Sequence, residues 1–310
     1  AERGDRGPHH GRPGSQARGH GGWQLNRPTY TDLIVEAAGR LRNVGLDTPQ
    51  REARHLMSLA SGLTTSEPIL RGHQVVPEYL SDVFGGMVAR REAREPFQHI
   101  AGSASFFGLE FISDARALVP RPDSEVVVEA ALRLLPDRAG LSIADLGTGS
   151  GCLLVAMLSS RPDVTGVGIE ADADPASLAV ENIARHGLEA RASVLVSTWK
   201  DWQGWQGVDL IISNPPYICT DVIPTLEPEV RVHDPGVALD GGKDGLDAYR
   251  EIARLARTLL KPGTPLVLEI GFDQNRAVRE ILSEAGLVGV GGGRDLGGND
   301  RVVWANQPDS

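Results

Sequence analysis

The chain has 310 residues, about the length at which a single hydrophobic core stops growing, so two domains are favoured over one. Hydrophobic residues make up 41% and charged residues 23% of the chain, and no apolar run approaches the roughly 20 residues that span a bilayer. These values argue against a membrane protein and against a wholly disordered chain. The only two cysteines, Cys152 and Cys219, exclude a disulfide framework and fit a reducing compartment, so we expect a cytoplasmic location.

The formal net charge of −10 is unevenly distributed along the chain. Residues 1–27 carry five arginines against Glu2 and Asp5, a net charge of +3, which leaves −13 on residues 28–310. Proteins that bind a long phosphate backbone neutralise it with Lys and Arg side chains. The acidic body therefore argues against nucleic acid as the main partner.

The composition of the N-terminal third of the chain changes near residue 28. Residues 1–22 are dominated by Gly, Arg, His and Pro, and we expect a disordered tail over residues 1–27. Apolar residues then recur at helical spacing over residues 31–94, with a helix start indicated by Thr29 to Asp32. The pattern predicts a small helical domain over residues 28–100. Its periodicity does not distinguish a packing or dimerisation module from a domain that recognises a partner macromolecule.

The rest of the chain predicts an α/β fold. Apolar and aromatic residues around Gly108 indicate a hairpin linker over residues 101–119. After Pro120 strands and helices alternate, with strands expected at 142–146, 166–170, 192–196, 208–213, 265–270 and 301–304, and helices at 124–135, 151–160, 175–186, 246–260 and 273–285. This alternation predicts a doubly wound, mostly parallel sheet with helices on both faces over residues 120–310.

The first of these strands runs into a glycine-rich turn, Asp145-Leu-Gly147-Thr148-Gly149-Ser150-Gly151. Glycines let the backbone turn sharply and let a ligand approach where a Cβ would clash. The G-x-G-x-G spacing differs from the G-x-G-x-x-G of dinucleotide sites, which weakens an interpretation as an NAD site. Glu170 ends the next strand, where a carboxylate can accept hydrogen bonds from ribose hydroxyls. The turn and the acid together predict a site for a nucleoside cofactor.

A second motif, Ser213-Asn214-Pro215-Pro216-Tyr217, follows a central apolar strand. Prolines fix φ and lack an N–H, so the loop presents carbonyl oxygens in a rigid arrangement. An amide or aniline-type NH2 is a poor nucleophile because its lone pair is delocalised. The Asn214 side-chain oxygen and the Pro215 carbonyl can each accept one N–H of such a group and stabilise the positive charge that grows on it during attack. Tyr217 would stack on the planar substrate.

These motifs resemble the class I S-adenosylmethionine-dependent methyltransferases that modify planar nitrogens through an NPPY loop. More narrowly, the chain resembles the release factor glutamine methyltransferases, which methylate the glutamine of the Gly-Gly-Gln loop in class I peptide chain release factors. The resemblance is carried by EPFQHIAGSASFFGLEF (95–111), LVPRPDSE (118–125), DLGTGSG (145–151), SNPPYI (213–218) and EVRVHDPGVALDGGKDGLDAYREI (229–252).

The resemblance implies S-adenosylmethionine as the cofactor, no metal, and class I release factors as partners, with the helical domain 28–100 recognising the substrate. The residues implied in cofactor binding are Gly147, Thr148, Gly149, Ser150 and Gly151 at the methionine part, Glu170 at the ribose, Trp199 near the adenine, and Asn214. The residues implied in holding the glutamine are Asn214, Pro215, Pro216 and Tyr217, of which Asn214, Pro215 and Tyr217 would be catalytic. Asp123 or Ser124 is expected to cap the helix that follows, and the family usually has Thr in place of Ser124.

Three other functions remain open at this point. An adenine-N6 nucleic-acid methyltransferase acts on an electronically similar nitrogen, but it should bring a basic groove and a base-flipping recognition domain. A glutamine methyltransferase for a ribosomal protein differs mainly in the PRPDSE stretch. A catalytically silent cofactor-binding scaffold would not need an intact NPPY loop.

Overall fold

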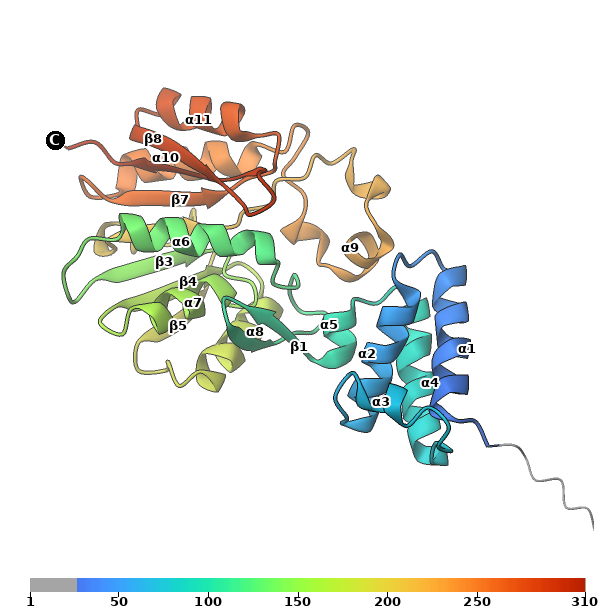
Figure 1. Ribbon diagram of the computed structural model, residues 1–310. Coiled ribbons are helices and arrows are strands. Elements are labelled where there is room, and N and C mark those ends of the chain that lie inside the picture. The colour runs from blue at the N-terminus through green and yellow to red at the C-terminus, as the bar shows by residue number, and fades with distance from the viewer. Residues whose placement is uncertain (1–26, 310) are drawn as a thin grey trace, which may run out of the picture.

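The computed structural model describes residues 27–309, so the tail predicted over residues 1–27 lies outside the described residues except for Arg27. A helical domain and a larger α/β domain lie beside each other and are joined through α5 and the hairpin that follows it (Figure 1). Among the described residues, no helix is both long enough and apolar enough to cross a membrane.

The helical domain consists of α1 (Tyr30–Asn43), α2 (Pro49–Ser61), α3 (Glu67–Leu70), α4 (Glu78–Glu92) and α5 (Phe97–Ala101). The helix start expected near Thr29 is confirmed. Thr29 Oγ1 accepts a hydrogen bond from the Asp32 N–H, and the Asp32 carboxylate accepts one from the Thr29 N–H. Leu41, Leu56 and Phe84 are buried in a core shared by α1, α2 and α4.

The α/β domain is built on a seven-stranded sheet in the order β5-β4-β3-β6-β7-β9-β8. Its strands are β3 (Ser142–Leu146), β4 (Thr165–Glu170), β5 (Ala192–Val196), β6 (Leu210–Ser213), β7 (Pro265–Glu269), β8 (Val288–Arg294) and β9 (Asp300–Asn306). Strands β3 to β7 pair in parallel, whereas β9 pairs antiparallel with both β7 and β8. The predicted doubly wound, mostly parallel sheet is confirmed.

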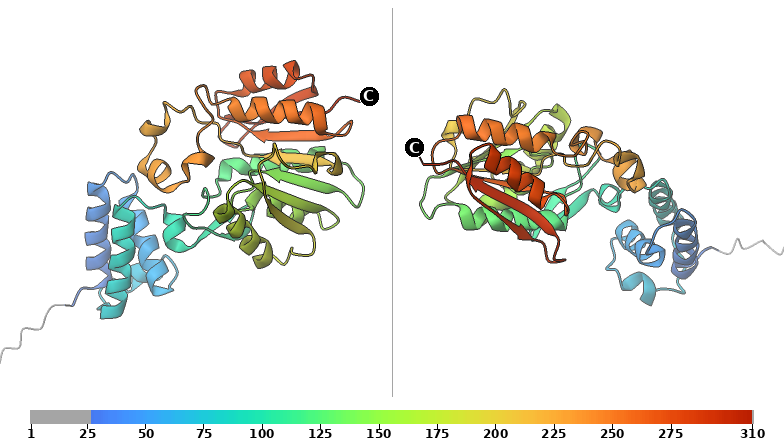
Figure 2. Two further views of the ribbon diagram at one scale, coloured as in Figure 1. Left: turned by 180° about the vertical axis from the view of Figure 1, so that it is seen from behind. Right: turned by 90° about the horizontal axis from the view of Figure 1, so that it is seen from above.

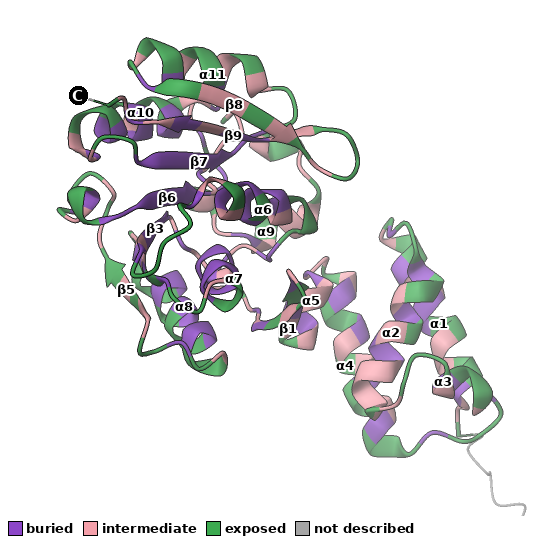
Figure 3. Cartoon of the chain, turned by 60° about the vertical axis from the view of Figure 1, so that its left-hand side comes forward, coloured by how far each residue is buried: buried purple, intermediate pink, exposed green. Residues whose placement is uncertain are grey.

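Helices cover both faces of this sheet (Figure 2). One face carries α6 (Glu125–Leu134), α7 (Cys152–Ser160) and α8 (Ala173–Arg185), and the other carries α10 (Asp247–Leu259) and α11 (Asn275–Glu284). Successive strand residues point to opposite cores: Ile143 packs with α6 and α7, whereas Ala144 packs with α10. Because both faces are covered, the central strands are fully buried (Figure 3) and read as continuous apolar runs.

Strand β8 is not predicted by the sequence, because four of its seven residues are glycine, which is depleted in strands. The neighbouring strand explains one of these glycines. A Cβ at Gly291 would collide with the indole ring of Trp304 on β9. The Trp304 ring fills the space that a side chain at position 291 would occupy. This contact becomes visible only when β8 and β9 are paired.

The predicted hairpin is present as β1 (Ser103–Phe106) and β2 (Leu109–Ile112). Its turn residues, Phe107 and Gly108, have φ values of 51° and 73°, as a two-residue hairpin turn with both centres at positive φ requires. Phe106 and Phe111 are buried in the same core as α6 and α7. The hairpin is therefore packed as part of the α/β domain.

One buried amide ties the hairpin to the glycine-rich turn. Asn182 of α8 is fully buried and accepts a hydrogen bond from the Ile112 N–H at 2.7 Å. Its Nδ2 donates to the Ile112 carbonyl at 3.2 Å and to the Ser150 carbonyl at 2.9 Å. A single side chain thus satisfies three backbone groups from two segments.

Replacing Asn182 with Ala should lower the free energy of unfolding by about 2–4 kcal/mol, because each buried polar group left unpaired costs roughly 1–3 kcal/mol. Urea unfolding followed by tryptophan fluorescence measures this change. Glu181→Ala is the matched control: its carboxylate is 48% exposed on the same helix, and an exposed ion pair contributes about 1 kcal/mol at most. Equal losses in the two variants would contradict the role assigned to Asn182.

Candidate active site

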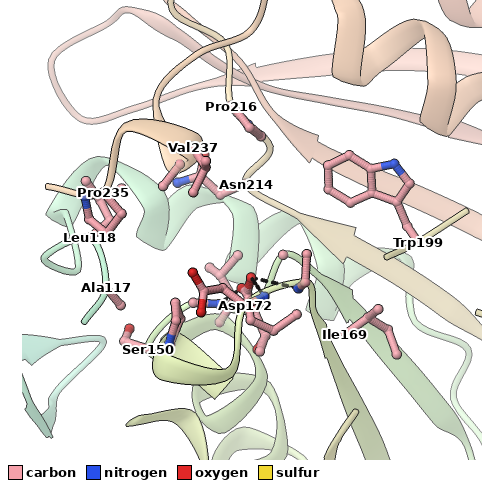
Figure 4. Close-up of a pocket in the computed structure, with 18 of the residues that line it drawn as sticks. Ala117, Leu118, Ser150, Ile169, Asp172, Trp199, Asn214, Pro216, Pro235 and Val237 are labelled. Atoms are coloured by element: carbon pink, nitrogen blue, oxygen red, sulfur yellow. Dashed lines mark hydrogen bonds between the residues drawn. The ribbon is translucent and has the colours of Figure 1, made fainter. Parts of the chain in front are cut away.

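A cavity of about 910 Å³ opens at the carboxyl ends of β3, β4 and β6. The strand order reverses at β3, and such a reversal is where doubly wound sheets bind their ligands. Figure 4 shows Asn214 and Pro216 on one side of the cavity, Ser150 and Asp172 on the opposite side, and the Trp199 ring at one end. Among residues 27–309, no three His, Cys, Asp or Glu side chains gather as metal ligands would.

The glycine-rich turn lies on the floor of the cavity. Gly147, Thr148, Gly149 and Ser150 line it, and Gly147 and Gly149 have φ values of 70° and 55°, which glycine adopts without strain. Thr148 Oγ1 donates a 2.7 Å hydrogen bond to the buried Asp145, which holds the turn on the strand beneath it. Burial raises the pKa of Asp145 to about 7.

Gly151 follows the same turn but is not among the cavity-lining residues. It begins α7 with a φ of 80°, and a Cβ there would lie 3.2 Å from the Ala179 Cβ of α8. Its position therefore permits the close approach of two helices, and a direct cofactor contact for Gly151 stays a prediction.

Glu170 lines the cavity at the end of β4 and stabilises the loops around it. Its Oε2 accepts a hydrogen bond from the Gly149 N–H at 2.9 Å, and its Oε1 accepts from the Ala171 and Asp172 N–H groups at 2.8 and 3.2 Å. A carboxylate oxygen has two lone pairs, so Oε2 can still accept a hydroxyl of a bound ligand.

Trp199 presents its ring to the cavity and is held by two hydrogen bonds. Its Nε1 donates to Glu251 of α10 at 2.9 Å, and its carbonyl accepts from Trp205 Nε1 at 3.0 Å. The ring orientation is therefore set before any ligand binds.

The NPPY loop places only part of its predicted set in the cavity. Asn214 and Pro216 line it, whereas Pro215 and Tyr217 are not among the lining residues. The Tyr217 ring packs against the core beneath α10, its hydroxyl donates to Glu269 at 3.4 Å, and burial raises its pKa. Its carbonyl accepts a 2.9 Å hydrogen bond from Gln274 Nε2. In this structure Tyr217 anchors the loop, and its stacking on a substrate stays a prediction.

Of Asp123 and Ser124, which were predicted to cap the following helix, Ser124 occupies the N-cap position of α6, but the hydroxyl cap expected there is wrong. A 3-10 turn, Pro122–Ser124, runs into α6, and Ser124 makes no capping hydrogen bond. Asp123 pairs with Arg301 at 3.3 Å, and the buried Ser124 hydroxyl accepts a hydrogen bond from Asn214 Nδ2 at 3.5 Å. The Asn214 amide thus points its nitrogen toward Ser124. The Asn214 Oδ1 receives no hydrogen bond from the described residues.

Sequence reasoning missed several residues that hold the site, namely Glu251 behind Trp199, and Glu269, Gln274 and Tyr249 behind the NPPY loop. One signal was available for Glu269. It ends the apolar run of β7, and a carboxylate is rarely fully buried. Glu251, Tyr249 and Gln274 lie in helices or loops, where a polar residue is common and gives no signal of a functional role.

Residues 218–245, the connecting segment, run from the NPPY loop to the helical domain and back. The segment holds three short helical turns, Ile223–Thr225, α9 (Pro228–His233) and Gly236–Ala238, and Pro235, Val237 and Ala238 line the cavity. Figure 1 shows α9 between the two domains.

An ion cluster joins α9 to the helical domain. Arg91 and Arg94 bind Glu229 at 2.9 and 2.6 Å, and the Arg91 side chain is only 7% exposed. Burial by itself would raise the pKa of Glu229. The hydrogen bonds from the two arginines together have the larger effect, so the pKa of Glu229 lies below its usual value. The helical domain and one wall of the cavity are thus mechanically linked.

A solved structure with a related fold is the hMettl16 catalytic domain in complex with MAT2A 3'UTR hairpin 1. Its TM-score is 0.55 at 16% identity, and the match covers 65% of this chain and 75% of that chain. A likeness at this identity shows the fold alone.

Both domains match family models: residues 32–102 match the PrmC N-terminal domain and residues 126–223 the methyltransferase small domain. The release factor glutamine methyltransferase of Caulobacter vibrioides is 41% identical over 275 residues, covering 89% of this chain and 95% of that protein. The enzyme of the same name from Agrobacterium fabrum is 37% identical over 279 residues, covering 89% and 96%. The chain belongs to the family of release factor glutamine methyltransferases, which are S-adenosylmethionine-dependent.

Proposed function

We propose that this protein transfers a methyl group from S-adenosylmethionine to the side-chain amide nitrogen of the glutamine in the Gly-Gly-Gln motif of class I peptide chain release factors. The observation that carries the proposal is the position of Asn214. Its Oδ1, free of protein donors among the described residues, belongs to a side chain that lines the same cavity as Glu170 and Trp199. An amide NH2 and a methyl donor can therefore meet there.

The cavity residues fit the cofactor, which supplies an electrophilic methyl group on a sulfonium when bound. The glycine-rich turn, Gly147 to Gly151, leaves room for close approach of the methionine part, because Gly147 and Gly149 carry no Cβ. Glu170 offers an acceptor to the ribose, and Trp199 offers a fixed aromatic face to the adenine. Asn214 borders both ligands.

The amide nitrogen needs orientation and charge stabilisation. Asn214 Oδ1 and the Pro215 carbonyl accept its two N–H groups, aim the nitrogen at the methyl group, and interact more strongly as positive charge grows on it. Pro216 forms part of the cavity wall beside the proposed glutamine position, and Tyr217 anchors the loop behind it. No general base is required, because the methylated nitrogen is acidic and loses its proton to water.

An adenine-N6 nucleic-acid methyltransferase is the second candidate, because the same two acceptors suit an aniline-type NH2. The net charge of −13 on residues 28–310 argues against it. A glutamine of a ribosomal protein is a closer alternative. The names of the relatives favour the release factor.

The experiment that tests the function is mass spectrometry of purified class I release factors after incubation with the protein and S-adenosylmethionine. The Gly-Gly-Gln peptide should gain about 14 daltons, the mass of one CH2 placed on an oriented amide nitrogen. A release factor with Ala in place of that glutamine is the control. Methylation of adenine in DNA or rRNA, with none on the release factor, would refute the proposal.

Asn214→Ala removes the side-chain acceptor and should lower kcat by about 100-fold or more, the size of effect seen when one preorganised hydrogen bond to developing charge is lost. Asn214→Asp keeps acceptor oxygens and should retain more activity than the Ala variant. Steady-state kinetics on one release factor measure both. An Ala variant within a few-fold of wild type, with an unchanged circular dichroism spectrum, would rule out the acceptor mechanism.

The helical domain, residues 28–100, is proposed to recognise the release factor. Support comes from the ion cluster of Arg91, Arg94 and Glu229, which sets its orientation relative to the cavity wall. A fixed orientation of two binding surfaces reduces the entropy lost when a large substrate docks.

Glu229→Gln should therefore lower kcat/KM for intact release factor about tenfold, equivalent to about 1.4 kcal/mol, while S-adenosylmethionine affinity stays unchanged. Glu227→Gln is the matched control, because the Glu227 side chain is 78% exposed and its ion pair with Arg94 is the only one it forms among the described residues. Isothermal calorimetry and steady-state kinetics give the two quantities. If a short Gly-Gly-Gln peptide loses as much turnover as the intact protein, the helical domain is not the recognition element.

We also propose a cytoplasmic location. Cys152 and Cys219 are free thiols, as expected in a reducing compartment, and the proposed substrates act in translation.

A further inference from the structure

We infer that a second cavity, on the helical domain, binds an acidic side chain of the protein substrate, whose carboxylate pairs with Arg51 and Arg54. The inference rests on the proposed function and deepens it, because it names the surface through which the helical domain recognises the release factor and the chemistry of the group bound there. This cavity shares no lining residue with the active-site cavity.

The second cavity has a volume of about 270 Å³ and lies between α2 and the start of α3. Pockets that enclose a whole small molecule measure about 300–1,000 Å³, so this one suits a single side chain of a partner. All but one of its lining residues can donate a hydrogen bond and none is acidic. They are Arg51, Arg54, His55, Thr65, Ser66 and Ile69.

Helix α2 presents three of these donors on one face. Arg51, Arg54 and His55 follow the i, i+3, i+4 spacing of neighbours on a helix surface, whereas the buried residues of α2 pack into the core of the helical domain. The His55 ring packs edge-on against Phe97 of α5, with 6.0 Å between the ring centroids. Two like charges three residues apart weaken a helix slightly, so the helix itself gains nothing from the arginine pair.

The arginines of this cavity differ from most others in the helical domain, which are paired with carboxylates: Arg40, Arg71, Arg90, Arg91 and Arg94. Neither Arg51 nor Arg54 forms an ion pair or a side-chain hydrogen bond within residues 27–309. Glu52, the one acid of α2, pairs with Arg91. Glu67, the one acid of α3, pairs with Arg71. The two guanidinium groups therefore keep their donors available for a carboxylate of another molecule.

The surroundings of the cavity favour a protein as the partner. Ile69 is 53% exposed at the cavity, and the adjacent Leu70 is 83% exposed. Arginines beside exposed apolar side chains are typical of the central part of protein–protein interfaces. A nucleic-acid backbone would instead need many cations along its length, and residues 28–310 carry a net charge of −13. The cavity therefore fits an Asp or Glu side chain that has an apolar neighbour.

The position of the cavity suits a substrate that also reaches the active site. Figures 1 and 2 show α1 on the outer side of the helical domain and α2 nearer the α/β domain. The carboxyl ends of β3 and β7 point toward the helical domain in Figure 1. A large protein whose glutamine enters the active site can thus touch α2 with another part of its surface.

The kinetic test uses Arg51→Glu and Arg54→Glu. Each should raise KM for intact release factor about tenfold or more, because a carboxylate would then meet a like charge. Turnover of a short Gly-Gly-Gln peptide and the affinity for S-adenosylmethionine should stay within about twofold of wild type, since neither ligand reaches α2. Arg54→Lys keeps the positive charge and should retain more affinity than Arg54→Glu.

Arg42→Glu is the matched control. Arg42 is exposed on α1, forms no ion pair within residues 27–309, and undergoes the same change of charge outside the cavity. An equal rise of KM in Arg42→Glu would show that only the overall charge matters and would overturn the inference. An unchanged KM in Arg51→Glu and Arg54→Glu, or an equal loss with the short peptide, would overturn it as well.

A second measurement does not depend on methyl transfer. In protein labelled with 15N-histidine, the ring signals of His55 are identified by their absence in His55→Gln. They should shift when a capped hexaglutamate peptide is added at millimolar concentration, and the shift should vanish in Arg54→Glu. No shift, or a larger shift with oligouridine RNA, would overturn the inference. A protein that shows the shift but does not methylate release factors would refute the proposed function alone.

Discussion

The site depends on one constraint of the sheet, the parallel pairing of β3 with β4 on one side and β6 on the other. Parallel strands end at the same edge, so the glycine-rich turn after β3, Glu170 after β4 and Asn214 after β6 come together although they are far apart in sequence. Helices on both faces keep this edge rigid, because every central strand is buried on both sides. The groups proposed to bind cofactor and substrate are therefore brought together by backbone pairing before any ligand is present.

Side-chain hydrogen bonds then refine the positions of these groups. Glu170 accepts three backbone N–H groups, Glu251 holds the Trp199 ring, and Asn182 ties the hairpin to the turn through Ser150. A buried polar group left without a partner is costly, so the buried contact between Asn182 and Ser150 selects one arrangement of the turn. Orientation matters more than affinity in a reaction that requires a poor nucleophile to be aimed at a methyl group.

The connecting segment gives the two domains a shared boundary. It begins at the NPPY loop, reaches the helical domain at Glu229, and returns to the cavity with Pro235 and Val237. Its backbone is fastened on the return by hydrogen bonds between Ile218 and both Leu239 and Gly241. If a large substrate docks on the helical domain, as proposed, it contacts a domain that is linked to the same segment that lines the cavity.

The sequence by itself determined the alternation of strands and helices, the glycine-rich turn and the NPPY loop, because each is encoded within a short stretch of residues. Only the tertiary structure decided which polar side chains serve the site. Glu269 meets Tyr217, and Glu229 meets Arg94, across more than 50 residues of chain, and such pairings depend on how helices and strands pack. Strand β8 was missed for the same reason, since the need for glycine at position 291 arises only from the neighbouring Trp304 ring. Local patterns report local geometry, whereas burial and partnership are properties of the folded chain.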